Sequence, residues 1–404
     1  MRHCYLKKYM PLAAFALMWM LAACEARMPE TETGTGTETE GLVFKLSAPP
    51  ALTVNATRAD DTKPLTLAGI EIKEVWVVQF DTDDKMLKAQ NFAQNKMKSI
   101  QDKESFLIEV ATDGFSNVNS HFRVIANAGT GFLTDFATGS EEKKLLQKTV
   151  ALTTIQSERS KETGLLISDA LEYTKVETTP QAEDGVHAVI MAPLNRAYAE
   201  MKVKWTDKLP NDGSSITITS IDACNLPKNI ALGTCAGDEK AVIYPAADAG
   251  NFDATYNLVS SSTETGIAAG TEKTFYMPEN LRGRGCATSF YEKNLKDYGP
   301  TALGTPPTLG TDGKPTGGSL ANCTYIELTG EYKYAEAHAG AITVKYRIYP
   351  GTNLIDDYNI RRGYSYTLDV QISGANSGDV RVTITDGGVV VFDEIDHINM
   401  TVDF

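Results

Sequence analysis

The feature that most constrains the fold is an alternation of apolar and polar residues with a period of two, which is typical of strands with one buried face. It is clear in "AITVKYRIYPG", where Ile342, Val344, Tyr346 and Ile348 recur at every second position. The same alternation occurs in five further groups: Leu42, Phe44 and Leu46; Met201, Val203 and Trp205; Ile216 and Ile218; Tyr366, Leu368, Val370 and Ile372; and Val380, Val382 and Ile384. Residues 72–80, "IKEVWVVQF", are instead apolar on both faces, which predicts a central strand.

Turn and loop signals separate these runs. Asn211-Asp212-Gly213 precedes one strand, and Asp386-Gly387-Gly388 is predicted to be a hairpin turn between "VRVTIT" and "VVVF". Residues 141–155 predict one short helix, and residues 299–318 are rich enough in Pro and Gly to predict a surface insertion without regular structure. Many strands and few short helices predict an all-β chain of antiparallel β-sandwiches.

The length of 404 residues suits two domains of ordinary size. Pro193 closes one region, and a new strand is expected from about Ala199. We therefore expect an N-terminal domain over residues 42–193 and a C-terminal domain over residues 194–404.

The first 41 residues indicate export. Basic residues precede an apolar run from Pro11 to Ala23, which suits a signal peptide over residues 1–23 and is too short to span a bilayer. Two alanines precede Cys24, as a lipoprotein signal peptidase requires, so Cys24 is the expected lipidation site. The alternative is an ordinary signal peptide with an accidental cysteine. Residues 24–41, rich in Thr, Glu and Gly, are expected to be a solvated tether.

The net charge and the cysteines limit which partners, disulfides and metal sites the sequence supports. A net charge of −14 argues against nucleic acid, because phosphate binding needs a basic face. Four late cysteines, Cys224, Cys235, Cys286 and Cys323, permit disulfides in an oxidising compartment. Cys224–Cys235 would close a short loop and Cys286–Cys323 a longer one, but the sequence does not choose among the three pairings. Scattered histidines and the lack of C-x2-C spacing disfavour zinc.

Signatures of enzymes are missing from the sequence. It contains no H-E-x-x-H, G-x-S-x-G or P-loop motif, so we expect neither an enzyme nor a cofactor. "DTDDKMLK" (81–88) has acids spaced like a calcium loop, but Met86 stands where that loop needs glycine, which favours a hairpin turn. His121 is expected to flank a strand. Trp76 and Trp205 fall inside strand patterns and are expected in the core.

Several segments resemble fimbrillins, the lipoprotein-precursor subunits of type V pili. The cysteine after the signal peptide, "LVFKLSAP", "ATRAD" and "IKEVWVVQFDTDDKML" occur in the order seen in that family. "FRVIANAG" (122–129) and "LNRAYAEMKVKW" (194–205) are similar to further segments of it. The resemblance is most specific in "TFYMPENLRG" (274–283), "TYIELTGEY" (324–332) and "VKYRIYPGTNLIDDYNIRRGYSYTLDVQISG" (344–374). In these segments Pro278 and Gly283 would shape a loop, and Asn280, Asp357 and Asn359 would bond the nearby backbone.

The resemblance implies two tandem transthyretin-like β-sandwiches and a pilus subunit assembled by strand exchange. In such pili the lipidated precursor reaches the outer membrane, an arginine-specific protease cuts after an early arginine, and the first strand leaves. A strand from a neighbouring copy or related pilin then fills the groove. Here residues 42–48 would be removed, with the cut between Arg58 and Ala59. The tail 389–404, in which Ile398, Met400, Val402 and Phe404 alternate, would be the donor strand or the last strand of its own sandwich.

Two other functions remain open. The chain could be an anchor or tip adhesin of the same pilus, contributing adhesion to a host or bacterial surface. It could also be a surface glycan-binding lipoprotein, for which tyrosine-rich stretches such as "YKY" (332–334) speak.

Overall fold

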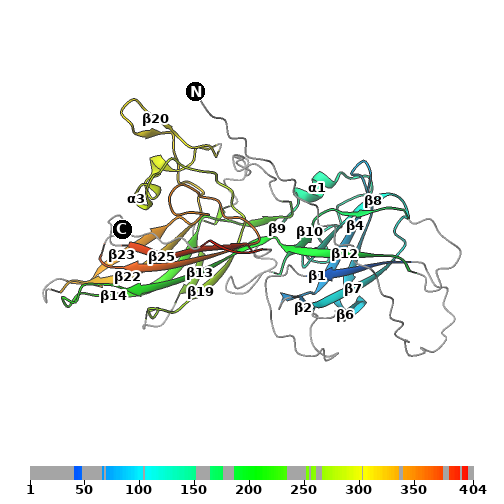
Figure 1. Ribbon diagram of the computed structural model, residues 1–404, viewed down its shortest axis with the longest axis horizontal. Coiled ribbons are helices and arrows are strands. Elements are labelled where there is room, and N and C mark those ends of the chain that lie inside the picture. Colours follow the sequence, from blue (N-terminus) through cyan, green and yellow to red (C-terminus); the bar gives the residue numbers. More distant parts are fainter. Residues whose placement is uncertain are drawn as a thin grey trace, which may run out of the picture. The chain divides into compact units, whose positions relative to one another are not determined.

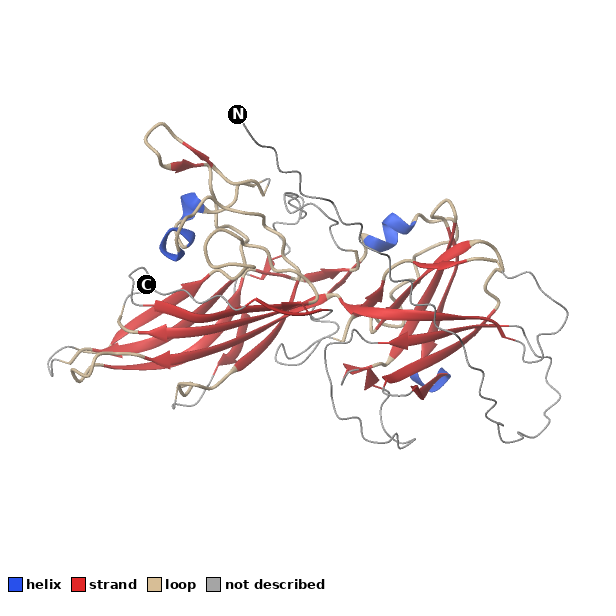
Figure 2. Cartoon of the chain, in the orientation of Figure 1, coloured by secondary structure: helices blue, strands red, loops and turns tan. Residues whose placement is uncertain are grey.

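The computed structural model describes residues 41–47, 66–67, 70–102, 105–151, 164–175, 186–233, 252–253, 256–260, 266–302, 304–335, 340–375, 382–391 and 394–398. Strands make up most of the regular structure of these residues, as Figure 2 shows, and the α-helices among them are short. The prediction of an all-β chain with few short helices is therefore confirmed. No helix in the described ranges combines the length and hydropathy needed to cross a membrane.

The first half of the chain forms a nine-stranded sheet. Its order is β5-β4-β8-β10-β12-β1-β7-β6, and β11 pairs with β8. Its strands are β1 (Gly41–Ser47), β4 (Glu74–Asp81), β5 (Met86–Ala93), β6 (Met97–Asp102), β7 (Ser105–Asp113), β8 (Ser120–Ala126), β10 (Leu166–Ser168), β11 (Leu171–Tyr173) and β12 (Val186–Arg196).

The predicted central strand is β4. It lies between β5 and β8, and every residue from Glu74 to Phe80 is buried. Both faces of β4 are apolar because each packs into a core: Val75 and Val77 belong to one apolar cluster, and Trp76, Val78 and Phe80 to another. The turn from Asp81 to Lys85 leads into β5, as predicted for "DTDDKMLK".

Two smaller sheets hold most of the second half. One has the order β19-β13-β24-β25-β26 and the other β18-β14-β22-β23. They pack on one shared core, to which Met201, Val203 and Trp205 contribute from β13 and Ile216 and Ile218 from β14, as their alternation predicted. The strands are β13 (Tyr198–Asp207), β14 (Ser215–Cys224), β18 (Tyr256–Ser260), β19 (Lys273–Pro278), β22 (Tyr325–Lys333), β23 (Ile342–Ile348), β24 (Tyr364–Ile372), β25 (Val382–Val391) and β26 (Glu394–Ile398).

Short elements complete the described chain. The helices are α1 (Glu142–Leu146), α3 (Phe290–Lys293), and the 3-10 turns η1 (Gln94–Lys96) and η3 (Lys296–Tyr298). The short strand pairs are β2 (Thr66–Leu67) with β3 (Ile70–Glu71), β9 (Thr149–Ala151) with β16 (Asn229–Ala231), β15 (Leu226–Pro227) with β17 (Phe252–Asp253), and β20 (Thr308–Leu309) with β21 (Pro315–Thr316).

Four details differ from expectation. The helix expected over 141–155 stops at Leu146, because Thr149–Ala151 pair with β16 instead. Asp386-Gly387-Gly388 is no hairpin turn. β25 continues through these residues and pairs with β24 before and after them, with a β-bulge opposite Asp369 and Val370. The insertion 299–318 contains the small β20–β21 pair. The pairs β1–β12 and β13–β24 are parallel rather than antiparallel.

The change from the first sheet to the second occurs slightly later than predicted. β12 continues beyond Pro193 to Arg196, which pairs with Leu166, and β13 begins at Tyr198. The expected start of a strand near Ala199 is therefore confirmed. The division into two transthyretin-like domains remains a prediction.

Candidate functional site

The first strand of the described chain is inserted in the middle of the nine-stranded sheet. β1 lies between β12 and β7, as Figure 1 shows, and pairs in parallel with β12 and antiparallel with β7. Without β1, both β12 and β7 would expose unpaired backbone groups at an open edge.

The side chains of β1 continue the core. Leu42, Phe44 and Leu46 are buried on one face and belong to the same apolar cluster, as their alternation predicted. Phe44 is fully buried and meets the edge of Phe122, with ring centroids 5.1 Å apart. Burial of each such side chain contributes about 1.5–3 kcal/mol.

Neighbouring residues define the slot that β1 fills. In the strand register, Phe44 is paired with Val110 of β7 on one side and with Ile190 of β12 on the other. Leu46 is paired with Ala192 of β12. Val110, Ile190 and Ala192 are buried members of the cluster. The hydroxyl of Thr112 donates to the carbonyl of Leu42 at 2.9 Å. Together they form an apolar trough of single-strand width between two backbone edges.

Most residues of the predicted maturation chemistry lie outside the described residues. These are Cys24, Arg58, Ala59, Met400, Val402 and Phe404, and Cys235 is outside them too. Ile398 is the last residue of β26 and pairs with Val389 of β25 in its own sheet. Among the described strands, β26 lies at the edge of that sheet, with β25 as its neighbour. The donor role of the tail remains a prediction.

The described cysteines carry free thiols. Cys286 and Cys323 are not bonded to each other, and Cys323 packs against Tyr349 and Tyr358 instead. Cys224 is also free. Burial raises the pKa of Cys323 to about 12 and raises the pKa of the other two thiols above the usual value. At neutral pH these thiols are protonated and weakly nucleophilic.

The loop motifs of the C-terminal half follow the prediction in part: their polar side chains bond backbone, but Asn280 and Asn359 bond distant backbone, and Pro278 is the last residue of β19. Gly283 has a φ of 86°, and a Cβ there would lie 2.0 Å from the carbonyl oxygen of Gly304. The side chain of Asn359 accepts a hydrogen bond from the Gly283 N–H at 2.7 Å. Asn280 pairs its backbone with Ile360 and donates through its amide to the Asn322 carbonyl at 2.8 Å. Asp357 accepts from the Thr352 N–H at 2.8 Å.

Two buried cations in this region were not expected from the sequence. Arg362 donates to the carbonyls of Ala231, Leu232 and Gly233 at 2.7–2.9 Å and pairs with Glu279 at 3.1 Å. Lys293 donates to the carbonyls of Asn353 and Asp357, each at 2.7 Å. Both cations hold loop backbone, and their carbonyl partners are remote in sequence.

Comparison with known proteins gives one family model and several solved structures. The model described as "Domain of unknown function (DUF4906)" matches residues 275–370, the region in which the motif resemblance is most specific. No similar protein was found among the curated proteins.

The similar solved structures include fimbrial and cell adhesion proteins. A candidate cell adhesion protein from Parabacteroides distasonis is 17% identical, with 84% of this chain and 89% of that chain covered and a TM-score of 0.47. The tip fimbrial protein Mfa3 of Porphyromonas gingivalis is 12% identical, with 85% and 98% covered and a TM-score of 0.41. A fimbrilin of Porphyromonas gingivalis is 14% identical, with 85% and 95% covered and a TM-score of 0.43.

Proposed function

We propose that this chain is a structural subunit of a fimbrillin-type pilus, exported as a lipoprotein precursor and assembled by strand exchange. The observation that carries the proposal is the position of β1. It is the first described strand, its apolar face is buried, and it fills a one-strand gap between β12 and β7. A strand of matching pattern from another molecule could occupy the same gap with the same hydrogen bonds.

Arg58 is the proposed cleavage site through which β1 would be released. In the sequence Arg58 lies between β1 and the next described strands, in a polar stretch of the kind in which proteases cut. A cut between Arg58 and Ala59 by an arginine-specific protease would separate β1 from the rest of the fold. The covalent link would be lost, although the hydrogen bonds and buried side chains would still hold the strand.

The C-terminal tail supplies a matching pattern. Ile398, Met400, Val402 and Phe404 alternate as Leu42, Phe44 and Leu46 do, so they could fill the trough in the same way. β26, which ends at Ile398, is bonded to β25 at the edge of its sheet. Release of an edge strand breaks one ladder of hydrogen bonds rather than two, which favours this segment as the donor.

The proposal fixes the partners and the location. The partners are other copies of this chain or related pilins, the protease, and the outer membrane during export through lipid on Cys24. The assembled protein would lie at the cell surface and contribute adhesion to a host or bacterial surface. Its role would be structural, without catalytic residues.

The test is proteolysis of the purified lipidated precursor with an arginine-specific protease. We expect a product that begins at Ala59 and forms multimers that resist SDS, detected by N-terminal sequencing and gel electrophoresis. Arg58→Ala should leave the fold intact, shown by an unchanged melting temperature, and stop multimer formation. Arg27→Ala is the matched control, because Arg27 precedes β1 and a cut there leaves β1 attached.

Normal multimers from Arg58→Ala would refute the proposal. Multimers that retain lipid on Cys24 would instead identify an anchor subunit. The same preparation therefore distinguishes a polymerising subunit from an anchor.

A further inference from the structure

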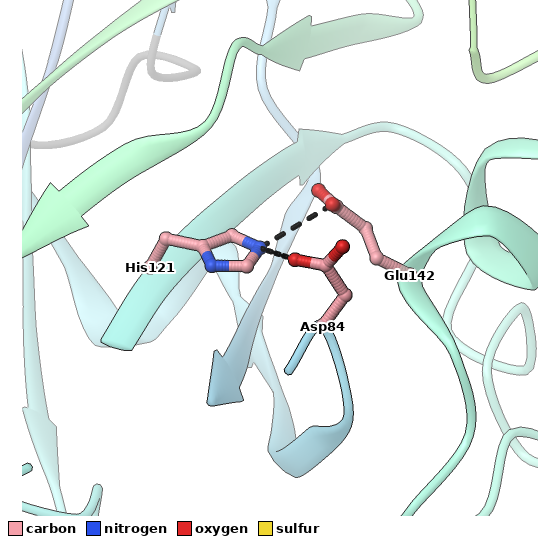
Figure 3. A group of neighbouring side chains, drawn as sticks. All are labelled: Asp84, His121 and Glu142. Atoms are coloured by element: carbon pink, nitrogen blue, oxygen red, sulfur yellow. Dashed lines mark ion pairs between the residues drawn. The ribbon is translucent and has the colours of Figure 1, made fainter. Parts of the chain in front are cut away.

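Three residues from separate elements bring metal-ligand atoms together at one end of the nine-stranded sheet. Asp84 lies in the β4–β5 turn, His121 is the second residue of β8, and Glu142 is the first residue of α1 (Figure 3). Each offers one ligand atom, and these atoms lie within 4.8 Å of one another. Nε2 of His121 is 3.3 Å from Oε2 of Glu142 and 3.9 Å from Oδ1 of Asp84.

The imidazole of His121 is buried and aimed at the two carboxylates. Its side chain is 10% exposed, and its ring stacks on Phe80 with centroids 5.4 Å apart. Figure 3 shows Nε2 directed toward Asp84 and Glu142. Nε2 is buried and has no hydrogen-bond partner. A buried polar atom without a partner is unfavourable, so a ligand bound between this nitrogen and the two carboxylates would be stabilising.

The carboxylate of Glu142 is held in an orientation that leaves one oxygen for such a ligand. Oε1 accepts a hydrogen bond from Nε of Arg123 at 2.6 Å, while Oε2 faces His121. The arginine thus fixes the carboxylate from behind, as outer-sphere residues do in metal centres.

The turn that carries Asp84 is also fixed. Oδ1 of Asp81 accepts hydrogen bonds from the N–H groups of Asp83 and Lys85 at 2.9 and 2.8 Å. The N–H of Glu142 donates to the carbonyl of Asp84 at 2.8 Å, which ties the turn to the start of α1. The position of the Asp84 backbone is therefore set, while its side chain, 67% exposed, remains able to rotate.

We propose that Asp84, His121 and Glu142 bind one zinc ion. Zinc takes imidazole nitrogen and carboxylate oxygen at about 2.0–2.2 Å, and in a tetrahedron such ligand atoms lie roughly 3.3–3.6 Å apart. The His121–Glu142 distance already matches, and rotation of the exposed Asp84 closes the other. Imidazole suits zinc better than calcium or magnesium, and water would complete the fourth position.

The ion would connect the β4–β5 turn, β8 and α1, which meet here from separate parts of the chain. This site is independent of the strand-exchange proposal, since none of its residues touches β1 in the pairing of the sheet. The competing explanation of the cluster is an ion-pair triad with a protonated His121, and the experiment below separates the two.

The experiment is calorimetric titration of the purified full chain with zinc chloride after treatment with EDTA. Asp84→Asn is the main variant, because Asp84 is exposed and asparagine tolerates the φ of 58° found there. Asp83→Asn is the matched control: it removes the same charge from the adjacent exposed position of the turn. We expect one site in the parent protein, at least about tenfold weaker binding in Asp84→Asn, and parent-like binding in Asp83→Asn.

A second readout is thermal unfolding with and without zinc. At a zinc concentration of about 100 times the Kd of the parent protein, the melting temperature of the parent should rise by roughly 5 °C, and that of Asp84→Asn by about half as much or less. The melting temperatures in EDTA show whether each variant is folded. Equal zinc binding by Asp84→Asn and Asp83→Asn, zinc binding that survives His121→Ala, or no binding by the parent protein would overturn the proposal and leave the ion-pair triad.

Discussion

Lys293 should make the stability of this protein depend on pH. It is fully buried, its ammonium group donates to two backbone carbonyls, and it lies 5.0 Å from the centre of the Tyr358 ring. Burial lowers the pKa of Lys293 to about 7 from an ordinary value of 10.5. Between these two pH values the unfolded chain holds the proton more tightly than the folded chain, so stability rises with pH.

We expect the free energy of unfolding of the parent protein to rise relative to that of Lys293→Met by about 2 kcal/mol between pH 7 and pH 9. Urea denaturation at each pH measures it. The variant should also be less stable at every pH in this range, because two buried carbonyls lose their donor. Lys296→Met, three residues on at an exposed position, is the control and should keep the pH dependence of the parent. A constant difference between parent and Lys293→Met would contradict the prediction.

The sequence predicted the local roles of single residues better than the distant ones. Asp357 accepts from the Thr352 N–H, five residues away, as a short polar side chain in a loop is expected to do. Asn280 and Asn359 instead bond backbone 42 and 76 residues away, at Asn322 and Gly283. Lys293 and Arg362 also bond distant backbone. Their carbonyl partners come from remote segments, and no spacing in the sequence indicates those contacts. The same holds for His121, because Asp84 and Glu142 are distant from it in sequence and only the fold brings them close to it.

β1 should be held in the sheet mainly by its apolar face. Phe44 is fully buried, so Phe44→Ala should lower the free energy of unfolding by about 3–5 kcal/mol, measured by denaturation of the uncleaved protein. If departure of β1 limits strand exchange, the same change should speed multimer formation after cleavage at Arg58. Lys45→Ala changes the next residue of the same strand, which is only half-buried, and should leave both quantities near those of the parent. A destabilised Phe44→Ala that forms multimers at the parent rate would show that another step limits assembly.

Strand patterns were predictable from the sequence, but the neighbours of each strand were not. Leu42, Phe44 and Leu46 indicate a buried face, yet nothing in their spacing places β1 between β12 and β7. Local signals failed where pairing overrode them. Asp386-Gly387-Gly388 has the composition of a turn, but its pairing with β24 keeps it in one strand. The leucines after Glu142 indicate a helix, but pairing with β16 makes Thr149–Ala151 a strand.

The net charge of the cleaved subunit should govern how fast such subunits meet. Residues 59–404 carry a net charge of −15, so the subunits repel one another, and salt screens that repulsion: the Debye length falls from about 30 Å at 0.01 M to about 8 Å at 0.15 M. Under the strand-exchange proposal, multimer formation after cleavage at Arg58 should therefore be several times faster at the higher salt concentration. Light scattering measures the rate.

A peptide of residues 41–47 separates this charge effect from strand insertion itself. The peptide carries Lys45 and is attracted to the acidic protein, so its insertion into cleaved protein that has lost β1 should slow slightly as salt rises. Strand insertion is common to both reactions, whereas repulsion acts only between whole subunits. If salt slowed multimer formation as well, the subunits would be meeting through patches of opposite charge, and the net charge would not be what limits their approach.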